Sequence, residues 1–302
     1  MLQLLDLNEK GAEMPAKPED GTPFDSPDLE AGSDGLPIRP VGAWSKDKHH
    51  FLNRYIHAFT TSMKGKPAWS GLGYVDLFSG PGMCRLRETG EEIDGSPLLA
   101  LGSSKPFDSL VFADISRDAL HAIEERFKRR NAAIVPMTMP GDCNQNAPKI
   151  VSLLPRGHLH LAFLDPTSLD IHFSTIRQLT AERRVDLIVS FMDRIDLVRN
   201  IKKNYYPNSR SNLDMFLGEE VDWRREYDSL PNTDATHVSR LILELYQTQL
   251  REIGYTHFGD RKRIAGAVPY YLLFFASKHR LGADLWNRTS STGPGGQRSF
   301  QW

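Results

Sequence analysis

The stretch Tyr74-Val75-Asp76-Leu77-Phe78-Ser79-Gly80-Pro81-Gly82 decides the expected fold of this chain. It is an apolar run that carries one acidic residue and then breaks into a glycine turn. A strand that ends in Gly-x-Gly lets the main chain approach a nucleotide-like ligand closely, because glycine has no Cβ. The pattern therefore predicts a buried parallel strand with a ligand pocket at its carboxyl end. The alternative for the turn alone is an ordinary tight turn after a strand.

Three further acidic residues stand where the next strands of such a sheet should end. Asp114, Asp142 and Asp165 each follow a short apolar run. Short runs of this kind are typical of buried parallel strands. Because ligands of open α/β sheets bind outside the carboxyl ends of the strands, these carboxylates and the glycine turn describe one site. Strands that alternate with helices predict an α/β fold with a doubly wound, mostly parallel sheet.

The order of these motifs resembles that of class I S-adenosylmethionine-dependent methyltransferases. The resemblance implies a Rossmann-like methyltransferase sheet and S-adenosylmethionine as the cofactor. It also implies that the sheet closes with a C-terminal antiparallel hairpin. The strands of this hairpin are expected at residues 254–258 and 269–276, separated by a basic turn at 260–263.

The same resemblance assigns roles to the residues at the strand ends. Asp76 is expected near the methionine amino group, Asp114 at the ribose hydroxyls and Asp142 at the adenine amino group. The residues expected to hold the cofactor are Asp76, Phe78, Gly80, Gly82, Ser96, Asp114, Ile115, Asp142 and Cys143. Asp165 and Pro166 fall beside the transferable methyl group and are the expected catalytic residues. The alternative for Asp165 is a helix cap or a structural hydrogen-bond acceptor.

More narrowly, the chain resembles the three-Cys-motif partner proteins. The motifs that carry this likeness are Lys46 through Tyr55, Val75 through Gly82, Gly95-Ser96-Pro97-Leu98, Phe163-Leu164-Asp165-Pro166, Arg184 through Ile188 and Phe275 through His279. Together they span most of the chain. The resemblance implies a fold and an association with a three-Cys-motif partner protein, and it names no substrate.

Composition excludes several classes of protein. The 302 residues are 40% hydrophobic, and no apolar stretch approaches the roughly 18 residues that a membrane helix needs. Only two cysteines are present, which excludes a disulfide scaffold and a zinc cluster. The histidines also lack metal-ligand spacing, so no metal site is expected. We therefore expect a cytoplasmic protein that is not bound to a membrane.

The charge of the chain is unevenly distributed, although the formal net charge is only −1. Residues 1–43 hold nine acids and three bases, together with many Pro, Gly and Ser residues. This composition predicts a disordered acidic leader. A Rossmann-like domain is expected over residues 44–286 with a helical insertion near 199–253, and a flexible tail over 287–302.

Two groups of cationic and aromatic residues are candidates for substrate binding. The first group is Lys46, Lys48 and His49, in the first turns of a helix expected to have Ser45 as its N-cap. Cations gain nothing from the dipole at a helix N-terminus, which favours an external partner, and the alternative is a solvated polar face. The second group is Lys202, Lys203, Tyr205 and Tyr206. Such side chains suit phosphates and stacked bases, and the alternative is an ordinary surface loop.

The sequence therefore predicts an S-adenosylmethionine-dependent methyltransferase that acts on nucleic acid or on a substrate presented by a partner protein. Its motif Asp165-Pro166-Thr167-Ser168-Leu169 lacks the second proline and the ring of methyltransferases that modify a base amino group, which leaves the acceptor atom open. The competing hypothesis is a non-catalytic accessory protein that binds the cofactor and docks a partner protein or nucleic acid.

Overall fold

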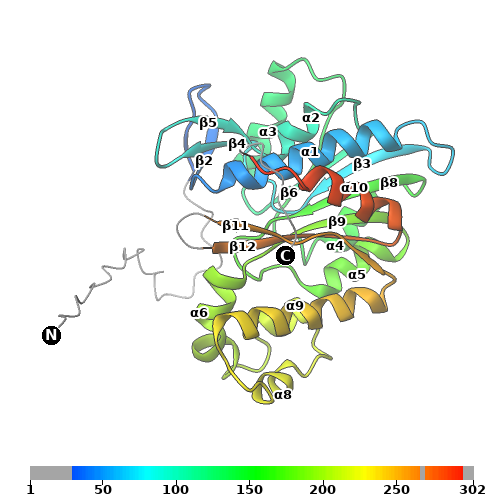
Figure 1. Cartoon of the computed structure of the whole chain (residues 1–302). Coiled ribbons are helices and arrows are strands. Elements are labelled where there is room, and N and C mark those ends of the chain that lie inside the picture. The colour runs from blue at the N-terminus through cyan, green and yellow to red at the C-terminus, as the bar shows by residue number, and fades with distance from the viewer. Residues whose placement is uncertain (1–28, 266–268, 295–302) are drawn as a thin grey trace.

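The computed structural model describes residues 29–265 and 269–294, and an eight-stranded sheet forms its centre (Figure 1). In spatial order the strands are β10 (His257–Phe258), β12 (Pro269–Ser277), β9 (Arg184–Phe191), β8 (His158–Leu164), β3 (Gly71–Asp76), β6 (Ser109–Asp114) and β7 (Met137–Pro140), while β11 (Lys262–Ala265) also pairs with β12. The five strands from β9 to β7 run parallel. Every residue of β3 is buried, as expected for a parallel strand covered on both faces.

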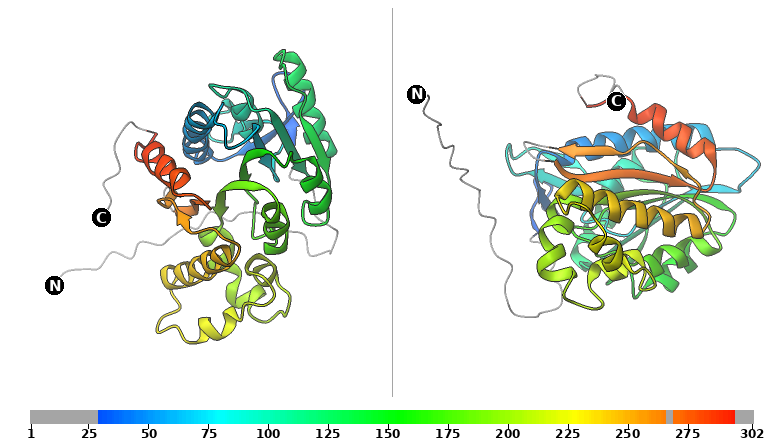
Figure 2. Two further views of the ribbon diagram at one scale, coloured as in Figure 1. Left: turned by 90° about the vertical axis from the view of Figure 1, so that its right-hand side faces the viewer. Right: turned by 60° about the horizontal axis from the view of Figure 1, so that its bottom comes forward.

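Helices cover both faces of this sheet, which confirms the predicted doubly wound, mostly parallel architecture (Figures 1 and 2). One face carries α1 (Ser45–Met63), α2 (Ser96–Leu101), α3 (Arg117–Arg129) and α10 (Arg280–Ser290), and the other carries α4 (Ala147–Leu153), α5 (Phe173–Ala181) and α9 (Ala235–Glu252). Successive side chains of a strand point to opposite faces. Tyr74 therefore belongs to one hydrophobic core and its neighbour Val75 to the other.

The C-terminal antiparallel hairpin is also confirmed. β12 runs antiparallel to β9 on one side and to β10 and β11 on the other. One detail of the prediction is wrong, because Lys262 and Arg263 of the expected basic turn belong to strand β11. The Arg263 guanidinium donates to the Asp193 carboxylate at 2.8 Å. The Arg263 side chain is therefore paired with a buried carboxylate, and its residue lies in a strand where a basic turn was expected.

The predicted boundary of the acidic leader at residue 43 is wrong. Within that segment, β1 (Glu30–Ala31) and β2 (Pro37–Val41) join β4 (Met83–Leu86) and β5 (Glu92–Asp94) in a second sheet, in the order β1-β2-β4-β5. Its acids form ion pairs with the domain: Glu30 contacts Arg85 at 2.9 Å and Asp34 contacts Arg126 at 2.8 Å. Residues 1–28 of the predicted leader lie outside the described residues.

Helix α1 begins one residue earlier than predicted. Trp44 is its N-cap and Ser45 its first residue, and no side-chain hydrogen bond caps this end. The expected apolar face is nevertheless buried, with Leu52, Tyr55 and Ile56 fully covered. The prediction from helical spacing therefore holds, and only the cap is corrected.

The region predicted as a helical insertion follows β9. Before α9 it contains two π-helices, η1 (Asp193–Leu197) and η2 (Ile201–Tyr205). It also contains the short α-helices α6 (Val198–Asn200), α7 (Asn212–Leu217) and α8 (Trp223–Asp228). The predicted start of the tail at residue 287 is too early, since α10 continues to Ser290, and residues 295–302 lie outside the described residues. No helix within 29–265 and 269–294 has the length and apolar character to cross a membrane.

Candidate active site

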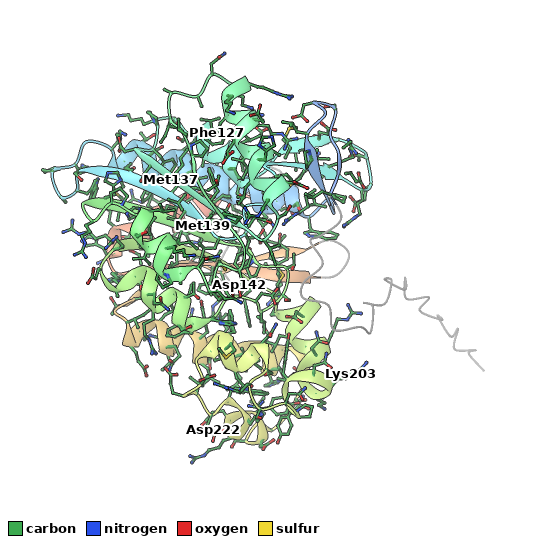
Figure 3. The ribbon with its side chains drawn as sticks, turned by 180° about the vertical axis from the view of Figure 1, so that it is seen from behind. Phe127, Met137, Met139, Asp142, Lys203 and Asp222 are labelled. Carbon is green, nitrogen blue, oxygen red and sulfur yellow. The ribbon has the colours of Figure 1, made fainter. Side chains whose placement is uncertain are left out.

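The four strand-end acids come together at one edge of the main sheet. Asp76 and Asp114 are the last residues of β3 and β6, while Asp142 and Asp165 follow β7 and β8. In Figure 3, Met137, Met139 and Asp142 follow one another along the chain toward this edge. The strands are parallel, so their carboxyl ends meet there. Two cavities open at the same place.

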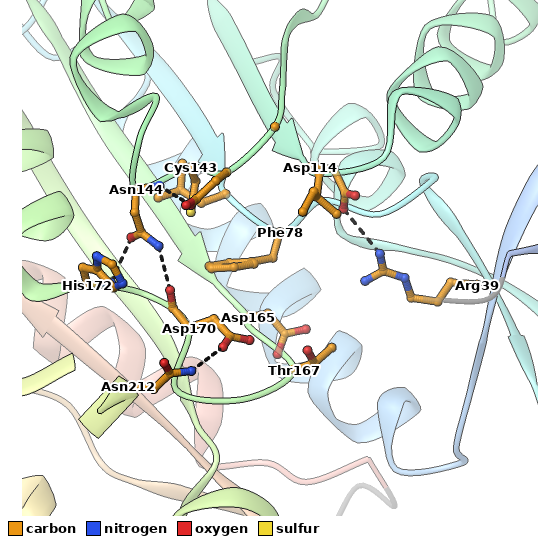
Figure 4. Close-up of a pocket in the computed structure, with 14 residues that line it drawn as sticks. Arg39, Phe78, Asp114, Cys143, Asn144, Asp165, Thr167, Asp170, His172 and Asn212 are labelled. Atoms are coloured by element: carbon orange, nitrogen blue, oxygen red, sulfur yellow. Dashed lines mark hydrogen bonds and ion pairs between the residues drawn. The ribbon is translucent and has the colours of Figure 1, made fainter. Parts of the chain in front are cut away.

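The first, cavity A, has a volume of about 280 Å³. Its lining consists of Arg39, Leu77, Phe78, Asp114, Ile115, Gly141, Asp142, Cys143, Asn144, Asp165, Thr167, Asp170, His172 and Asn212 (Figure 4). Leu77, Phe78, Ile115 and Cys143 give this cavity apolar walls, and nine of its other ten lining residues are polar or charged. Burial, followed by the charge of Asp142, raises the pKa of the Cys143 thiol to about 12, so Cys143 contributes a neutral wall.

The second, cavity B, has a volume of about 490 Å³. Its lining includes Trp44, Lys48, His49, Gly80, Gly82, Cys84, Arg87, Ser96, Pro166, Met192 and Tyr271. Four residues line both cavities: Arg39, Phe78, Asp165 and Thr167. The cavities therefore adjoin, and these four side chains stand at their junction.

The glycine turn forms one side of this junction. Gly80 has a φ of 60° and Gly82 a φ of 88°, a region that residues with a Cβ seldom adopt. A Cβ on Gly80 would also lie 3.3 Å from Cζ of Arg39. The amide of Gly95 donates to the carbonyl of Gly82 at 2.8 Å and fixes the turn against the start of α2.

Asp76 contacts this turn through hydrogen bonds and lines neither cavity. Its carboxylate is fully buried and accepts from the Ser96 hydroxyl at 2.5 Å and from the Phe78 amide at 3.1 Å. Burial raises the pKa of Asp76 to about 7, although the hydrogen bonds from Ser96 and Phe78 oppose the rise. Asp76 was expected to contact the cofactor, and the structure instead places it behind Ser96, which does line cavity B.

Asp114 faces both the glycine turn and cavity A. Its Oδ2 accepts from the Gly80 amide at 2.8 Å and its Oδ1 from the Ser116 amide at 2.9 Å. The Arg39 guanidinium is a third partner at 3.3 Å (Figure 4). Two main-chain amides therefore orient the carboxylate, and its side chain is only 4% exposed.

A polar network that the sequence did not reveal joins the loops around cavity A. The Asn144 side chain donates to the Asp170 carbonyl at 2.8 Å and accepts from the His172 amide at 2.9 Å (Figure 4). Asn212 of α7 donates to the Asp170 carboxylate at 3.0 Å. The loop after β7, the loop after β8 and the helical insertion are thereby tied together. Asn144 lies only two residues after Asp142, and this proximity was the one available signal.

Asp165 is paired with Lys48 of α1. Their side chains are 16% and 11% exposed and form a short ion pair. Burial works against the charge of Lys48, but the Asp165 carboxylate outweighs it and holds the pKa of Lys48 above its ordinary value. Oδ1 of Asp165 is buried and has no hydrogen-bond partner among the described residues. Lys48 thus holds one carboxylate oxygen and leaves the other available.

Two more polar groups face the same ion pair. Burial, and then the charge of Lys48, lower the pKa of His49 to about 3, so its imidazole is neutral near pH 7. The Lys48 ammonium lies 5.5 Å from the ring centroid of Tyr271. Nδ1 of His49 has no hydrogen-bond partner within residues 29–265 and 269–294.

The predicted substrate residues do not form one group. Lys48 and His49 line cavity B, whereas Lys46 is on the surface and pairs with Glu91 at 2.5 Å. Lys202 and Lys203 are exposed, and Lys203 lies well away from Asp142 in Figure 3. The Tyr205 hydroxyl donates to Asp196 at 2.7 Å and the Tyr206 hydroxyl to Asp228 at 2.8 Å. None of these last four residues lines cavity A or cavity B.

Comparison with known proteins gives only distant structural likenesses. No protein-family model and no curated protein matches the chain. Among solved structures, a protein from Legionella pneumophila str. Philadelphia 1 is 13% identical with a TM-score of 0.49, and the match covers 82% of this chain and 92% of that one. The O-methyltransferase TomG from Streptomyces achromogenes, solved with SAM, is 12% identical with a TM-score of 0.43 and coverages of 78% and 80%.

A third similar structure is an O-methyltransferase from Bacillus cereus in complex with SAH. It is 13% identical with a TM-score of 0.44, and the match covers 81% of this chain and 85% of that one. None of the comparisons shows the three-Cys-motif partner family. The likenesses assign no role to any residue here, and the α/β fold of this chain rests on its own strand order and closing hairpin.

Proposed function

We propose that this protein binds S-adenosylmethionine and transfers its methyl group to an acceptor. The observation that carries the proposal is the position of Asp114, a carboxylate that the Gly80 and Ser116 amides fix in the wall of cavity A, next to Arg39 at the junction with cavity B. Such an acceptor at the end of a second parallel strand suits a ribose diol. Asp165 stands at the same junction, between the space for the cofactor and the space for an acceptor.

The residues present fit the parts of this cofactor. Cavity A offers Phe78, Ile115 and Cys143 as apolar walls and Asp142 as a polar contact for adenine. Asp114 would hold the ribose, while the glycine turn and Ser96 would hold the amino-acid end. When bound, S-adenosylmethionine supplies an electrophilic methyl group. Because the sulfonium needs no acid catalyst, the contribution of the protein is to align the acceptor.

Asp165 is the residue best placed to orient the acceptor. Its unpartnered Oδ1 would accept a hydrogen bond, or a proton, from an N–H or O–H group of the acceptor. The Lys48 ammonium holds the other oxygen and prevents the carboxylate from rotating. Pro166 restricts the backbone at this point.

Calorimetry with S-adenosylmethionine, S-adenosylhomocysteine and NAD tests this proposal. We expect binding of the first two and none of NAD. Asp114→Ala should weaken binding about ten- to hundredfold, because hydrogen bonds to a charged acceptor contribute about 1.5–3 kcal/mol. Asp165→Ala should have a smaller effect, since Asp165 addresses the acceptor. Asp118→Ala, four residues away at an exposed position of α3, is the matched control and should bind like the wild type.

Melting temperatures of the variants distinguish a lost contact from a lost fold. An Asp114→Ala protein that folds and binds normally would contradict the ribose assignment, and heat with NAD alone would contradict the methyltransferase proposal. Binding of S-adenosylmethionine without transfer to any acceptor tested would favour the accessory-protein hypothesis.

We further propose that the acceptor is nucleic acid or a substrate presented by a partner protein. Support comes from Lys202 and Lys203, exposed cations of the helical insertion whose α7 residue Asn212 lines cavity A. Single-stranded RNA should then bind with an affinity that falls steeply with salt, because each neutralised phosphate releases counterions. The pair Lys202→Glu and Lys203→Glu should weaken binding, while Lys105→Glu, also exposed, should not. Undetectable or salt-insensitive binding would leave a partner-presented substrate as the better hypothesis.

A further inference from the structure

Arg39 reaches the candidate site from outside the central sheet. It lies on β2 of the small sheet, where it pairs with Cys84 of β4. The hairpin that carries it is anchored independently, because the Arg126 guanidinium binds both oxygens of Asp34 and the carbonyl of Pro37. Arg39 can therefore change its side-chain contacts while the strand stays in place.

The guanidinium of Arg39 makes fewer hydrogen bonds in this structure than it has donors for. Its contact with Asp114 is 3.3 Å long, whereas hydrogen bonds between a cation and a carboxylate are usually about 2.7–2.9 Å. Nε of Arg39 is buried and has no hydrogen-bond partner among the described residues. Asp114 already has the amides of Gly80 and Ser116 at 2.8 and 2.9 Å. A ligand hydroxyl can therefore replace Arg39 on Asp114 without leaving that carboxylate disordered.

A released Arg39 would lie at the junction of the two cavities. It lines both of them, and Cζ is 3.3 Å from the Cβ position of Gly80 in the glycine turn. Lys48, a buried cation that lines cavity B, is held by Asp165. An anionic group of a ligand that lies along the glycine turn would consequently meet Arg39. A guanidinium suits a carboxylate in particular, because its planar fork can donate two parallel hydrogen bonds.

We propose that Arg39 is a specificity residue for the carboxylate at the amino-acid end of the cofactor. The ribose diol replaces the guanidinium on Asp114, and the freed guanidinium then binds the carboxylate. This inference rests on the proposed function. It has a distinctive consequence, since a ligand with the diol but no carboxylate must displace Arg39 and gains nothing in return.

The test is calorimetry with S-adenosylhomocysteine and adenosine on the full chain. The first ligand has both groups and an uncharged sulfur, which avoids repulsion between a sulfonium and the guanidinium. Adenosine has the diol alone. Arg39→Met should weaken S-adenosylhomocysteine about ten- to hundredfold. The same variant should bind adenosine at least as tightly as the wild type does.

Two more variants complete the design. Arg117→Met removes an exposed arginine at the start of α3 that lines neither cavity, and its affinity for both ligands should stay within about twofold of the wild type. Arg39→Lys keeps the charge and loses the fork, so it should weaken S-adenosylhomocysteine by an intermediate factor. It also supplies the measurement if Arg39→Met does not fold, as judged by its melting temperature.

The outcomes distinguish this inference from the proposed function. Equal losses for both ligands would show that Arg39 only orients Asp114, and tighter binding of both would show that it only obstructs the site. Either result overturns the inference and leaves the proposed function standing. A wild-type protein that binds neither ligand overturns both.

Discussion

Arg126→Met should lower the free energy of unfolding by roughly 3–5 kcal/mol. The guanidinium is only 3% exposed and joins three separate parts of the chain. It binds the Asp34 carboxylate at 2.8 and 3.0 Å, the Pro37 carbonyl at 2.8 Å and the Pro81 carbonyl at 2.6 Å. Methionine fills part of the space but donates no hydrogen bond, so buried carbonyls lose their partner at about 1–3 kcal/mol each.

Urea denaturation measures this change directly. The matched control is Arg129→Met on the same helix, which loses one exposed hydrogen bond to the Asp34 carbonyl at 2.8 Å and should cost under about 1 kcal/mol. Because Pro81 belongs to the glycine turn, Arg126→Met should also weaken cofactor binding. A variant within 1 kcal/mol of the wild type would show that the hairpin of β1 and β2 does not depend on this arginine.

Asp186→Asn should stabilise the protein at alkaline pH and leave its stability almost unchanged at acidic pH. Asp186 lies on β9, is 7% exposed and has Oδ2 only 3.0 Å from the Cβ position of Gly282 in α10. Burial raises the pKa of its carboxyl group to about 7 from an ordinary value of 3.8, against an opposing hydrogen bond from Ser277. The folded chain therefore favours the protonated carboxyl group, which asparagine imitates.

The sign follows from this raised pKa. The stability that Asp186 contributes is fully present below its unfolded pKa of 3.8 and is lost as the pH rises through about 7. A difference of about three pKa units corresponds to about 4 kcal/mol, so Asp186→Asn should exceed the wild type by up to that amount near pH 9. The pKa of Asp76 is also raised, but Asp76 is present in both proteins. Its contribution therefore cancels when the unfolding free energies of Asp186→Asn and the wild type are subtracted.

Unfolding free energies of both proteins from pH 5 to pH 9 give this result. Asp284→Asn is the control, because Asp284 lies on α10, the helix that packs against Asp186, but is 43% exposed and pairs with Arg280. Its effect should stay below about 0.5 kcal/mol at every pH. A difference between Asp186→Asn and wild type that does not grow with pH would contradict the raised pKa.

Much of the central architecture could be predicted because it depends on local patterns. The apolar run of β3, the glycine turn and the acids that follow the next strands each lie within a few residues of one another, so alternation and turn chemistry reveal them. The buried face of α1 was equally visible, since Leu52, Tyr55 and Ile56 recur at helical spacing. The leader was misjudged for the opposite reason. Its acids at positions 30 and 34 have partners 55 and 92 residues away.

The candidate site could likewise be predicted only where it depends on local sequence patterns. Sequence order placed the four strand-end acids at one edge of the sheet, because parallel strands end together. It did not show that Asp76 turns away from both cavities toward Ser96, or that Asp114 shares its carboxylate with Arg39. Nor did it show that two lysines only two residues apart have different environments. Lys48 is buried and pairs with Asp165, whereas Lys46 is exposed and pairs with Glu91.

The sequence by itself determined the parallel sheet, the closing hairpin and the edge at which a ligand site would lie, because these follow from hydrophobic periodicity and from residues that are neighbours in the chain. Only the tertiary structure decided which cations reach that edge. Arg39 and Lys48 meet Asp114 and Asp165 across separations of 75 and 117 residues. Contacts between residues so far apart in the sequence depend on how the small sheet and α1 pack against the core. Local sequence patterns do not reveal that packing.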